Sequence, residues 1–172
     1  MARDEIGLVF QPQYAVATGA LAGAEALARW DHPQLGRIGA ETLFAIAERG
    51  DHVAQLSRHI AQRALAIASA WQPALAISLN VTAEDLADQQ FAHNVQAILK
   101  DTGLAPGLLT LEVTEHALVA DFAGAAEALG ELAAIGVRIA LDDFGTGYAN
   151  FQTLKALPVD TLKLDASLAR DI

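Results

Sequence analysis

Strand-like and helix-like segments alternate along almost the whole chain, and this alternation restricts the fold more than any other feature of the sequence. Parallel strands need long crossover connections, usually helices, so the alternation predicts an α/β domain built on a parallel sheet. The predicted strands cover residues 6–11, 21–30, 76–81, 108–114, 137–142 and 159–165. The predicted helices cover residues 42–48, 53–71, 83–86, 91–101, 121–135 and 148–157, with a loop over 31–36.

Polar residues of these strands fall on one of the two faces. In residues 108–114, Leu109, Leu111 and Val113 alternate with Glu112, and the strands near 80, 140 and 163 follow the same pattern. A doubly wound open sheet needs both faces apolar, whereas a closed barrel packs helices outside and can hold polar groups inside. We therefore predict a (β/α) barrel whose site lies at the carboxyl ends of the strands. The inward residues late in their strands are Asn80, Glu112, Asp142 and Lys163.

Size and charge limit the function classes. The chain has 172 residues, enough for one domain with a substantial core. Its 21 acidic and 11 basic residues give a net charge of −10, which argues against nucleic-acid polymers and anionic membranes as partners. The absence of cysteine excludes disulfides, zinc–thiolate sites and thiol catalysis. The charged first residues and the lack of a long apolar run predict a cytoplasmic protein with no membrane contact.

Two adjacent carboxylates, Asp142 and Asp143, follow an apolar strand and precede Gly145-Thr146-Gly147. Successive strand side chains point to opposite faces, so these carboxylates can converge only if the strand ends there and the backbone turns. Convergent carboxylates need a cation or a proton between them, which indicates a divalent-metal site. A solvated Asp-Asp cap on the following helix explains the dipeptide equally well.

Glu25 and Lys163 raise a similar question. Glu25 lies among alanines in a predicted buried strand, where an unpaired carboxylate is costly. Lys163 can serve a catalytic site, or it can form a structural ion pair with Asp142 or Asp165. The residues by themselves leave both roles of the lysine open.

Several short motifs together resemble the EAL-domain family of cyclic di-GMP phosphodiesterases. The signature is Glu25-Ala26-Leu27, followed by Arg29-Trp30. The supporting motifs are Gln11-Pro12, His32-Pro33 with Gly36, and residues 78–82, 111–115, 142–148 and 157–165, in family order over nearly the whole chain. The resemblance implies a TIM-like (β/α) barrel of the EAL type over residues 1–172. It also implies metal-dependent hydrolysis of cyclic di-GMP to linear pGpG.

The resemblance implies a role for each matching residue. The implied metal ligands are Glu25, Asn80, Glu112, Asp142 and Asp143. Oxygen ligands suit Mg²⁺ or Mn²⁺, and the resemblance implies a two-metal site with Ca²⁺ as an inhibitor. Lys163 matches the lysine that orients or activates the attacking water, and Glu115 matches the acid that steadies the loop after Asp143. The implied substrate-binding residues are Gln11, Leu27 and Arg29, the last of them on a phosphate.

The chain also departs from the family pattern. Ala40, Leu43 and Ala45 stand where the family usually has prolines and a phenylalanine at the entry to the site, and Thr82 and Ala166 replace a serine and an arginine. The family continues beyond Asp165 with two more strands and helices, and its seventh strand supplies a catalytic glutamate. A whole barrel typically has about 250 residues, so the sequence predicts a barrel lacking its last two βα units.

Such a barrel would expose its first and sixth strands as edges, which predicts a homodimer, a partner protein or low stability. It would also hydrolyse cyclic di-GMP slowly, because one positioned acid is missing. Whether this chain is itself an enzyme is therefore left open. The alternatives to a phosphodiesterase are a non-catalytic sensor that binds cyclic di-GMP and a protein-interaction module.

Overall fold

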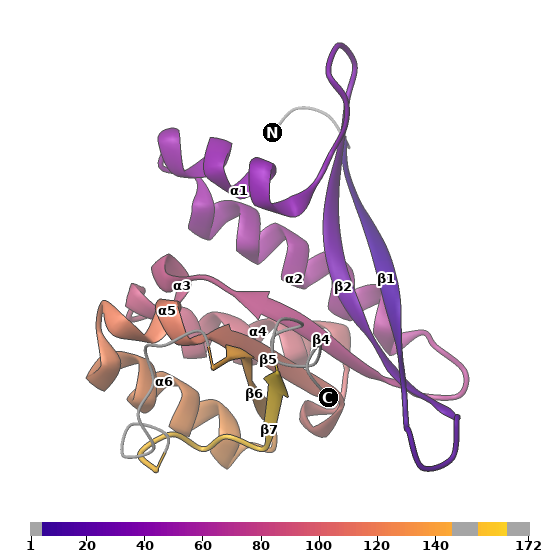
Figure 1. The fold of residues 1–172 in the computed structure, drawn as a ribbon, viewed down its shortest axis with the longest axis vertical. Coiled ribbons are helices and arrows are strands. Elements are labelled where there is room, and N and C mark those ends of the chain that lie inside the picture. The colour runs from indigo at the N-terminus through magenta and orange to yellow at the C-terminus, as the bar shows by residue number, and fades with distance from the viewer. Residues whose placement is uncertain (1–4, 146–154, 165–172) are drawn as a thin grey trace.

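The computed structural model describes residues 5–145 and 155–164. Seven strands form one sheet in the order β1-β2-β4-β5-β6-β7, with the short β3 paired to β2 (Figure 1). The strands are β1 (Ile6–Tyr14), β2 (Leu21–His32), β3 (Gly36–Ile38), β4 (Ala76–Val81), β5 (Leu109–Thr114), β6 (Arg138–Phe144) and β7 (Thr161–Leu164). The helices are α1 (Ala40–Arg49), α2 (Val53–Ser69), α3 (Ala83–Ala87), α4 (Phe91–Thr102), α5 (Glu115–Val119) and α6 (Phe122–Ala134), and a 3-10 turn, η1, covers Pro106–Leu108.

The predicted α/β alternation is present, but the prediction of a parallel sheet is wrong for its first strand. β1 pairs antiparallel with β2 in a long hairpin that stands at one side of the molecule (Figure 1). The reason is the short connection: the N–H of Ala15 donates to the carbonyl of Ala20, and Gly19 takes the positive φ of 68° that this turn needs. Strands β2, β4, β5, β6 and β7 are parallel, as predicted.

The apolar face of each central strand is buried, and this follows the predicted alternation. On β5, Leu109, Leu111 and Val113 are at most 2% exposed and belong to one cluster with residues of α2, α4 and α6. On β2 the buried residues that face the helices are Ala24, Ala26 and Ala28, and small side chains suit close packing of a helix against the sheet. The other face of the sheet is therefore left for the polar residues.

Most predicted helices are present, and each of their ends lies within two residues of the predicted one. α4 ends at Gly103, whose φ of 70° is the left-handed conformation typical of a helix C-terminus. α3 begins with a capping box in which Thr82 and Asp85 each accept a backbone N–H. Three short elements were not predicted: α5, η1, and β3, which begins at Gly36, the last residue of the predicted loop over 31–36. The predicted helix over 148–157 falls largely outside the described residues.

The end of β6 differs from the expectation drawn from its two aspartates. The strand does not stop at Asp142 but runs to Phe144. Asp143 has a φ of +53°, and the pairing with β7 shifts register between Leu141 and Phe144. The backbone therefore changes direction inside the strand, as in a β-bulge.

No helix in the described part of the chain is long and apolar enough to span a membrane.

Gly23 allows β2 and β4 to lie close together beside the predicted site. A Cβ on Gly23 would lie 2.7 Å from the carbonyl oxygen of Ala76, its partner on β4. We expect Gly23→Ala to reduce the free energy of unfolding by about 1–3 kcal/mol, the usual range for overpacking. Gly7→Ala is the matched control, because the nearest atom to its Cβ is 3.9 Å away. Urea unfolding measures both, and equal stability of the two variants would contradict the prediction.

Candidate functional site

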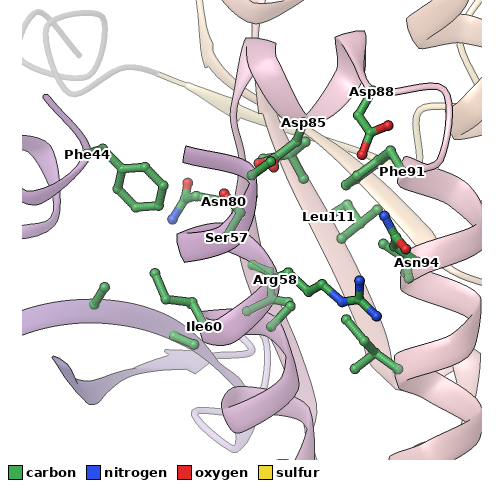
Figure 2. A pocket seen from close by; sticks show the side chains of 18 of the residues that line it. Phe44, Ser57, Arg58, Ile60, Asn80, Asp85, Asp88, Phe91, Asn94 and Leu111 are labelled. Atoms are coloured by element: carbon green, nitrogen blue, oxygen red, sulfur yellow. The ribbon is translucent and has the colours of Figure 1, made fainter. Parts of the chain in front are cut away.

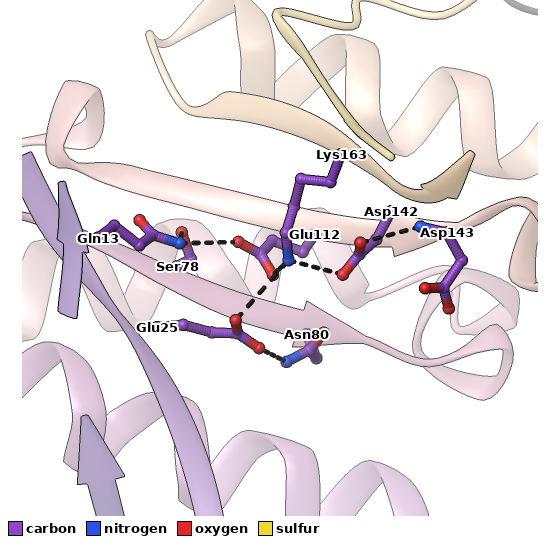
Figure 3. Close-up of polar contacts among 8 residues, drawn as sticks. All are labelled: Gln13, Glu25, Ser78, Asn80, Glu112, Asp142, Asp143 and Lys163. Atoms are coloured by element: carbon purple, nitrogen blue, oxygen red, sulfur yellow. Dashed lines mark hydrogen bonds and ion pairs between the residues drawn. The ribbon is translucent and has the colours of Figure 1, made fainter. Parts of the chain in front are cut away.

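Three carboxylates from three strands meet one ammonium group at the carboxyl ends of the parallel strands (Figure 3). The Nζ atom of Lys163 on β7 lies 2.5 Å from Oε2 of Glu112 and 2.7 Å from Oδ2 of Asp142. Oε2 of Glu25 lies 3.7 Å from the same nitrogen. Three acids that are far apart in the sequence are therefore gathered around one point.

Strand register explains how Asn80 joins this cluster. Asn80 on β4 pairs with Glu112 on β5, and Glu25 on β2 pairs with Ser78 on β4. Residues two apart in a strand share a face, so Asn80 and Glu25 point to the same side of the sheet. Nδ2 of Asn80 donates to Oε1 of Glu25 at 2.7 Å. Four of the five predicted metal ligands are thus neighbours in space.

The cluster combines burial with an excess of negative charge. Glu112 is 2% exposed, and burial raises the pKa of its carboxyl even though the hydrogen bond from Lys163 acts to lower it. Burial also acts to lower the pKa of Lys163, but its hydrogen bonds to Asp142 and Glu112 outweigh burial, and the pKa is raised. The lysine is therefore a cation in this arrangement. One ammonium faces three carboxylates, which leaves a net negative site.

The donor atoms fit a hard divalent cation. Their arrangement is a different matter: in the part of the chain that the structure describes, no three His, Cys, Asp or Glu residues are arranged to hold a metal ion. The Lys163 ammonium occupies the point where the carboxylates converge. Carboxylate and amide oxygens are the ligands that Mg²⁺ and Mn²⁺ prefer.

The ion pair of Lys163 with Asp142, one of the alternatives raised by the sequence, is present. Asp165, the other possible partner, lies outside the described residues.

Asp143 does not join the carboxylates around Lys163. Its backbone N–H donates to Oδ1 of Asp142 at 2.9 Å, and Figure 3 shows its own carboxylate turned away from the lysine. The positive φ of Asp143 produces this direction. Glu115 lies just beyond β5 and is 3% exposed, and its Oε1 accepts the N–H of Gly145 at 2.9 Å. A buried acid therefore fixes the backbone two residues after Asp143.

The three predicted substrate-binding residues lie on the hairpin near Glu25. Gln11 is exposed and pairs with Glu25 across the hairpin. Leu27 is half-buried and lines the cavity of Figure 2. Arg29 is half-buried, and its Nη1 donates to the carbonyl of Ala28 at 2.7 Å. The structure thus places these residues on the same hairpin as Glu25, while their contacts with substrate stay predictions.

A cavity of about 90 Å³ lies between α2 and α4, on the face of the sheet that the helices cover (Figure 2). Asn80 lines it, but Glu25, Glu112, Asp142 and Lys163 do not. The residues that line it include Phe44, Ser57, Arg58, Asp85 and Phe91, which are labelled in Figure 2. We place the chemistry at the carboxylates rather than in this cavity, because the charged groups converge there.

Two further residues touch the cluster and were not predicted as site residues. Nε2 of Gln13 on β1 lies 3.4 Å from Oε1 of Glu112 and 3.4 Å from Oγ of Ser78. Gln13 has the same strand parity as Gln11, and Ser78 has that of Asn80, so an alternation signal for both was present in the sequence. The sequence did not reveal that β1 runs antiparallel to β2, and without this direction Gln13 could not be placed beside Glu112.

Comparisons with known proteins identify the family of the chain. The model of the EAL domain family matches residues 1–172. An uncharacterized signaling protein of Caulobacter vibrioides is 38% identical over 172 residues, which are 100% of this chain and 21% of that protein. The cyclic di-GMP phosphodiesterase PA2567 of Pseudomonas aeruginosa is 36% identical over 168 residues, which are 96% of this chain and 29% of that protein. The chain thus spans less than a third of the length of these curated relatives.

Solved structures give the same result for the fold. The phosphodiesterase PaMucR, in its complex with c-di-GMP, is similar with a TM-score of 0.89 and 33% sequence identity, over 97% of this chain and 71% of that one. The EAL enzyme Bd1971, bound to cAMP and cyclic di-GMP, has a TM-score of 0.89 and 27% identity over 98% of this chain and 48% of that one. These neighbours have the TIM-like barrel fold, which agrees with the predicted fold class. The chain therefore belongs to the EAL domain family.

Proposed function

We propose that this chain is a metal-dependent phosphodiesterase domain that hydrolyses cyclic di-GMP to linear pGpG. The observation that carries the proposal is the convergence of Glu25, Glu112 and Asp142 on one cation position at the strand ends, with Asn80 beside them. Relatives named cyclic di-GMP phosphodiesterases, and a neighbour solved with c-di-GMP, support the choice of substrate.

Each residue has a defined task in this proposal. Glu25, Asn80, Glu112 and Asp142 would hold Mg²⁺ or Mn²⁺ through oxygen atoms. Asp143 would join them as a ligand after its carboxylate turns toward the ion. When bound, such ions polarise a phosphodiester and generate a nucleophile from water at neutral pH. Lys163 would orient the attacking water, since its ammonium already lies among the acids. Glu115 would keep the backbone after Asp143 in place through Gly145.

Substrate positioning belongs to the hairpin. Arg29 would exchange its bond to the Ala28 carbonyl for a charge-assisted bond to a phosphate. Gln11 and Leu27 would line the dinucleotide and exclude water beside Glu25. A cytoplasmic location, and contacts with a second copy or with a partner protein, complete the proposal and rest on the sequence alone.

We expect hydrolysis of cyclic di-GMP to depend on Mg²⁺ or Mn²⁺ and to be inhibited by Ca²⁺. Ca²⁺ prefers more ligands and longer bonds, about 2.3–2.6 Å against 2.0–2.1 Å for Mg²⁺, so it would bind without the geometry that turnover needs. Chromatography of the linear product, after EDTA treatment and re-addition of each ion, measures this. Calorimetry in EDTA should also show weaker binding of cyclic di-GMP, because the site is net negative.

The possible outcomes separate the candidate functions. Metal-dependent turnover supports the phosphodiesterase. Metal-dependent binding of cyclic di-GMP without turnover, even with Mn²⁺, would support the sensor and overturn catalysis. Equal binding in EDTA and in Mn²⁺ would contradict a metal-bridged complex.

A further inference from the structure

We propose that Gln13 and Ser78 are positioning residues that fix the carboxylate of Glu112 so that its Oε2 faces the cation position. This inference rests on the proposed function, because it concerns the same site. Both residues lie outside the predicted ligands, and neither contacts the ammonium of Lys163 through a bond that the structure describes.

Glu112 is buried, so both of its carboxylate oxygens need partners. Its side chain is 1% exposed, and a carboxylate that is removed from water needs a hydrogen-bond partner for each oxygen. Oε2 has the Lys163 ammonium, while Oε1 has Nε2 of Gln13 at 3.4 Å. The Ser78 hydroxyl lies 3.4 Å from the same Nε2 and accepts a hydrogen bond from it, which holds the Gln13 amide beside Glu112. The two oxygens of one acid are thus divided between a charged partner and a neutral pair.

Gln13 and Ser78 approach Glu112 from a different direction than Lys163 does. Because β1 runs antiparallel to β2, Gln13 pairs with Gly23, two residues before Glu25 along β2. Ser78 pairs with Glu25 and lies two residues before Asn80 along β4. Both side chains therefore approach Glu112 from the side of the amino ends of the parallel strands (Figure 3). Lys163 lies on the opposite side, at the carboxyl ends of these strands. Gly23 carries no side chain that could stand between Gln13 and Ser78.

The side chains of Gln13 and Ser78 are both uncharged. An amide and a hydroxyl can orient a carboxylate without neutralising it, so Glu112 keeps its charge for a cation at Oε2. Such outer partners of metal ligands typically change metal affinity by about 10–100-fold when they are removed. Without Gln13 the carboxylate could rotate and offer Oε2 in the wrong direction.

Binding of Mn²⁺ alone, measured by calorimetry and by electron paramagnetic resonance on the purified protein, tests this inference. We expect Gln13→Met, which keeps the volume but removes the donor, to weaken Mn²⁺ binding by about 10–100-fold. The kcat for cyclic di-GMP should fall while KM stays nearly unchanged, because Gln13 acts through Glu112 and not on the substrate. Ser78→Ala should weaken Mn²⁺ binding in the same direction and provides a second variant if the first fails to fold.

Gln62→Met is the matched control, since Gln62 is an exposed glutamine of α2. Its Kd for Mn²⁺ should equal that of the original protein. A fall in melting temperature with an unchanged Kd in Gln13→Met or Ser78→Ala would show a merely structural role and overturn the inference, while the proposed metal site would stand. Absence of Mn²⁺ binding in the original protein would overturn the proposed metal site, and this inference with it.

Discussion

Replacing Glu112 by glutamine is expected to slow the hydrolysis of cyclic di-GMP by about 10³-fold or more while leaving the protein folded. A metal ion supplies several kcal/mol of transition-state stabilisation, and each 1.4 kcal/mol is about tenfold in rate. Glu112 is the most buried of the three acids, so water cannot easily replace its oxygen as a ligand. The rate of product formation under saturating Mn²⁺ measures the effect.

Stability should respond differently from activity. Burial raises the pKa of Glu112, so its ionised form opposes folding, and the metal-free protein loses stability as pH rises through that pKa. Glutamine is never ionised, so Glu112→Gln should lose this pH dependence and be about as stable as the original protein near neutral pH. Glu131→Gln, at an exposed position of α6, is the matched control for charge removal. Full activity of Glu112→Gln would overturn the role of Glu112 as a ligand.

The fold could be predicted where the hydrophobic period was regular. Leu109, Leu111 and Val113 on β5 are buried because alternation marks one face of a strand, and the predicted burial is confirmed. Strand direction could not be predicted in this way, since hydrophobic alternation looks the same in a parallel and an antiparallel strand. Only the turn between Ala15 and Ala20 determines that β1 is antiparallel. The five-residue α5 has too few residues for a helical period to be recognised.

The candidate site was predictable to the extent that parity and strand ends determine it. Glu112, Asn80 and Asp142 were expected to lie together from their inward parity, and register brings them together. Gln13 was missed because its approach to Glu112 depends on the direction of β1 and not on any local pattern. The direction of the Asp143 carboxylate could not be predicted, because it follows from a positive φ at a residue other than glycine.

Lys163 carries the second large effect. Its ammonium balances part of the charge of Glu25, Glu112 and Asp142, and its side chain is 30% exposed. Breaking a fully buried ion pair costs about 3–5 kcal/mol, and this partial exposure reduces the figure to about 1–3 kcal/mol. We expect Lys163→Met to lower the free energy of unfolding of the metal-free protein by that amount. Urea unfolding in EDTA measures it, with Lys100→Met at an exposed position of α4 as the control.

Divalent cations should reverse this loss, because Lys163→Met leaves three carboxylates around a point that no longer has a positive charge. A ligand that binds only the folded state stabilises it by RT ln(1 + [L]/Kd), so saturating Mn²⁺ should raise the melting temperature of Lys163→Met more than that of the original protein. Hydrolysis should nevertheless stay about 10²–10⁴-fold slower with Mn²⁺, because the positioned group beside the attacking water is gone. If Mn²⁺ stabilises both proteins equally, the lysine and the metal do not share one position. If Lys163→Met hydrolyses cyclic di-GMP at the original rate, Lys163 is a structural ion pair alone.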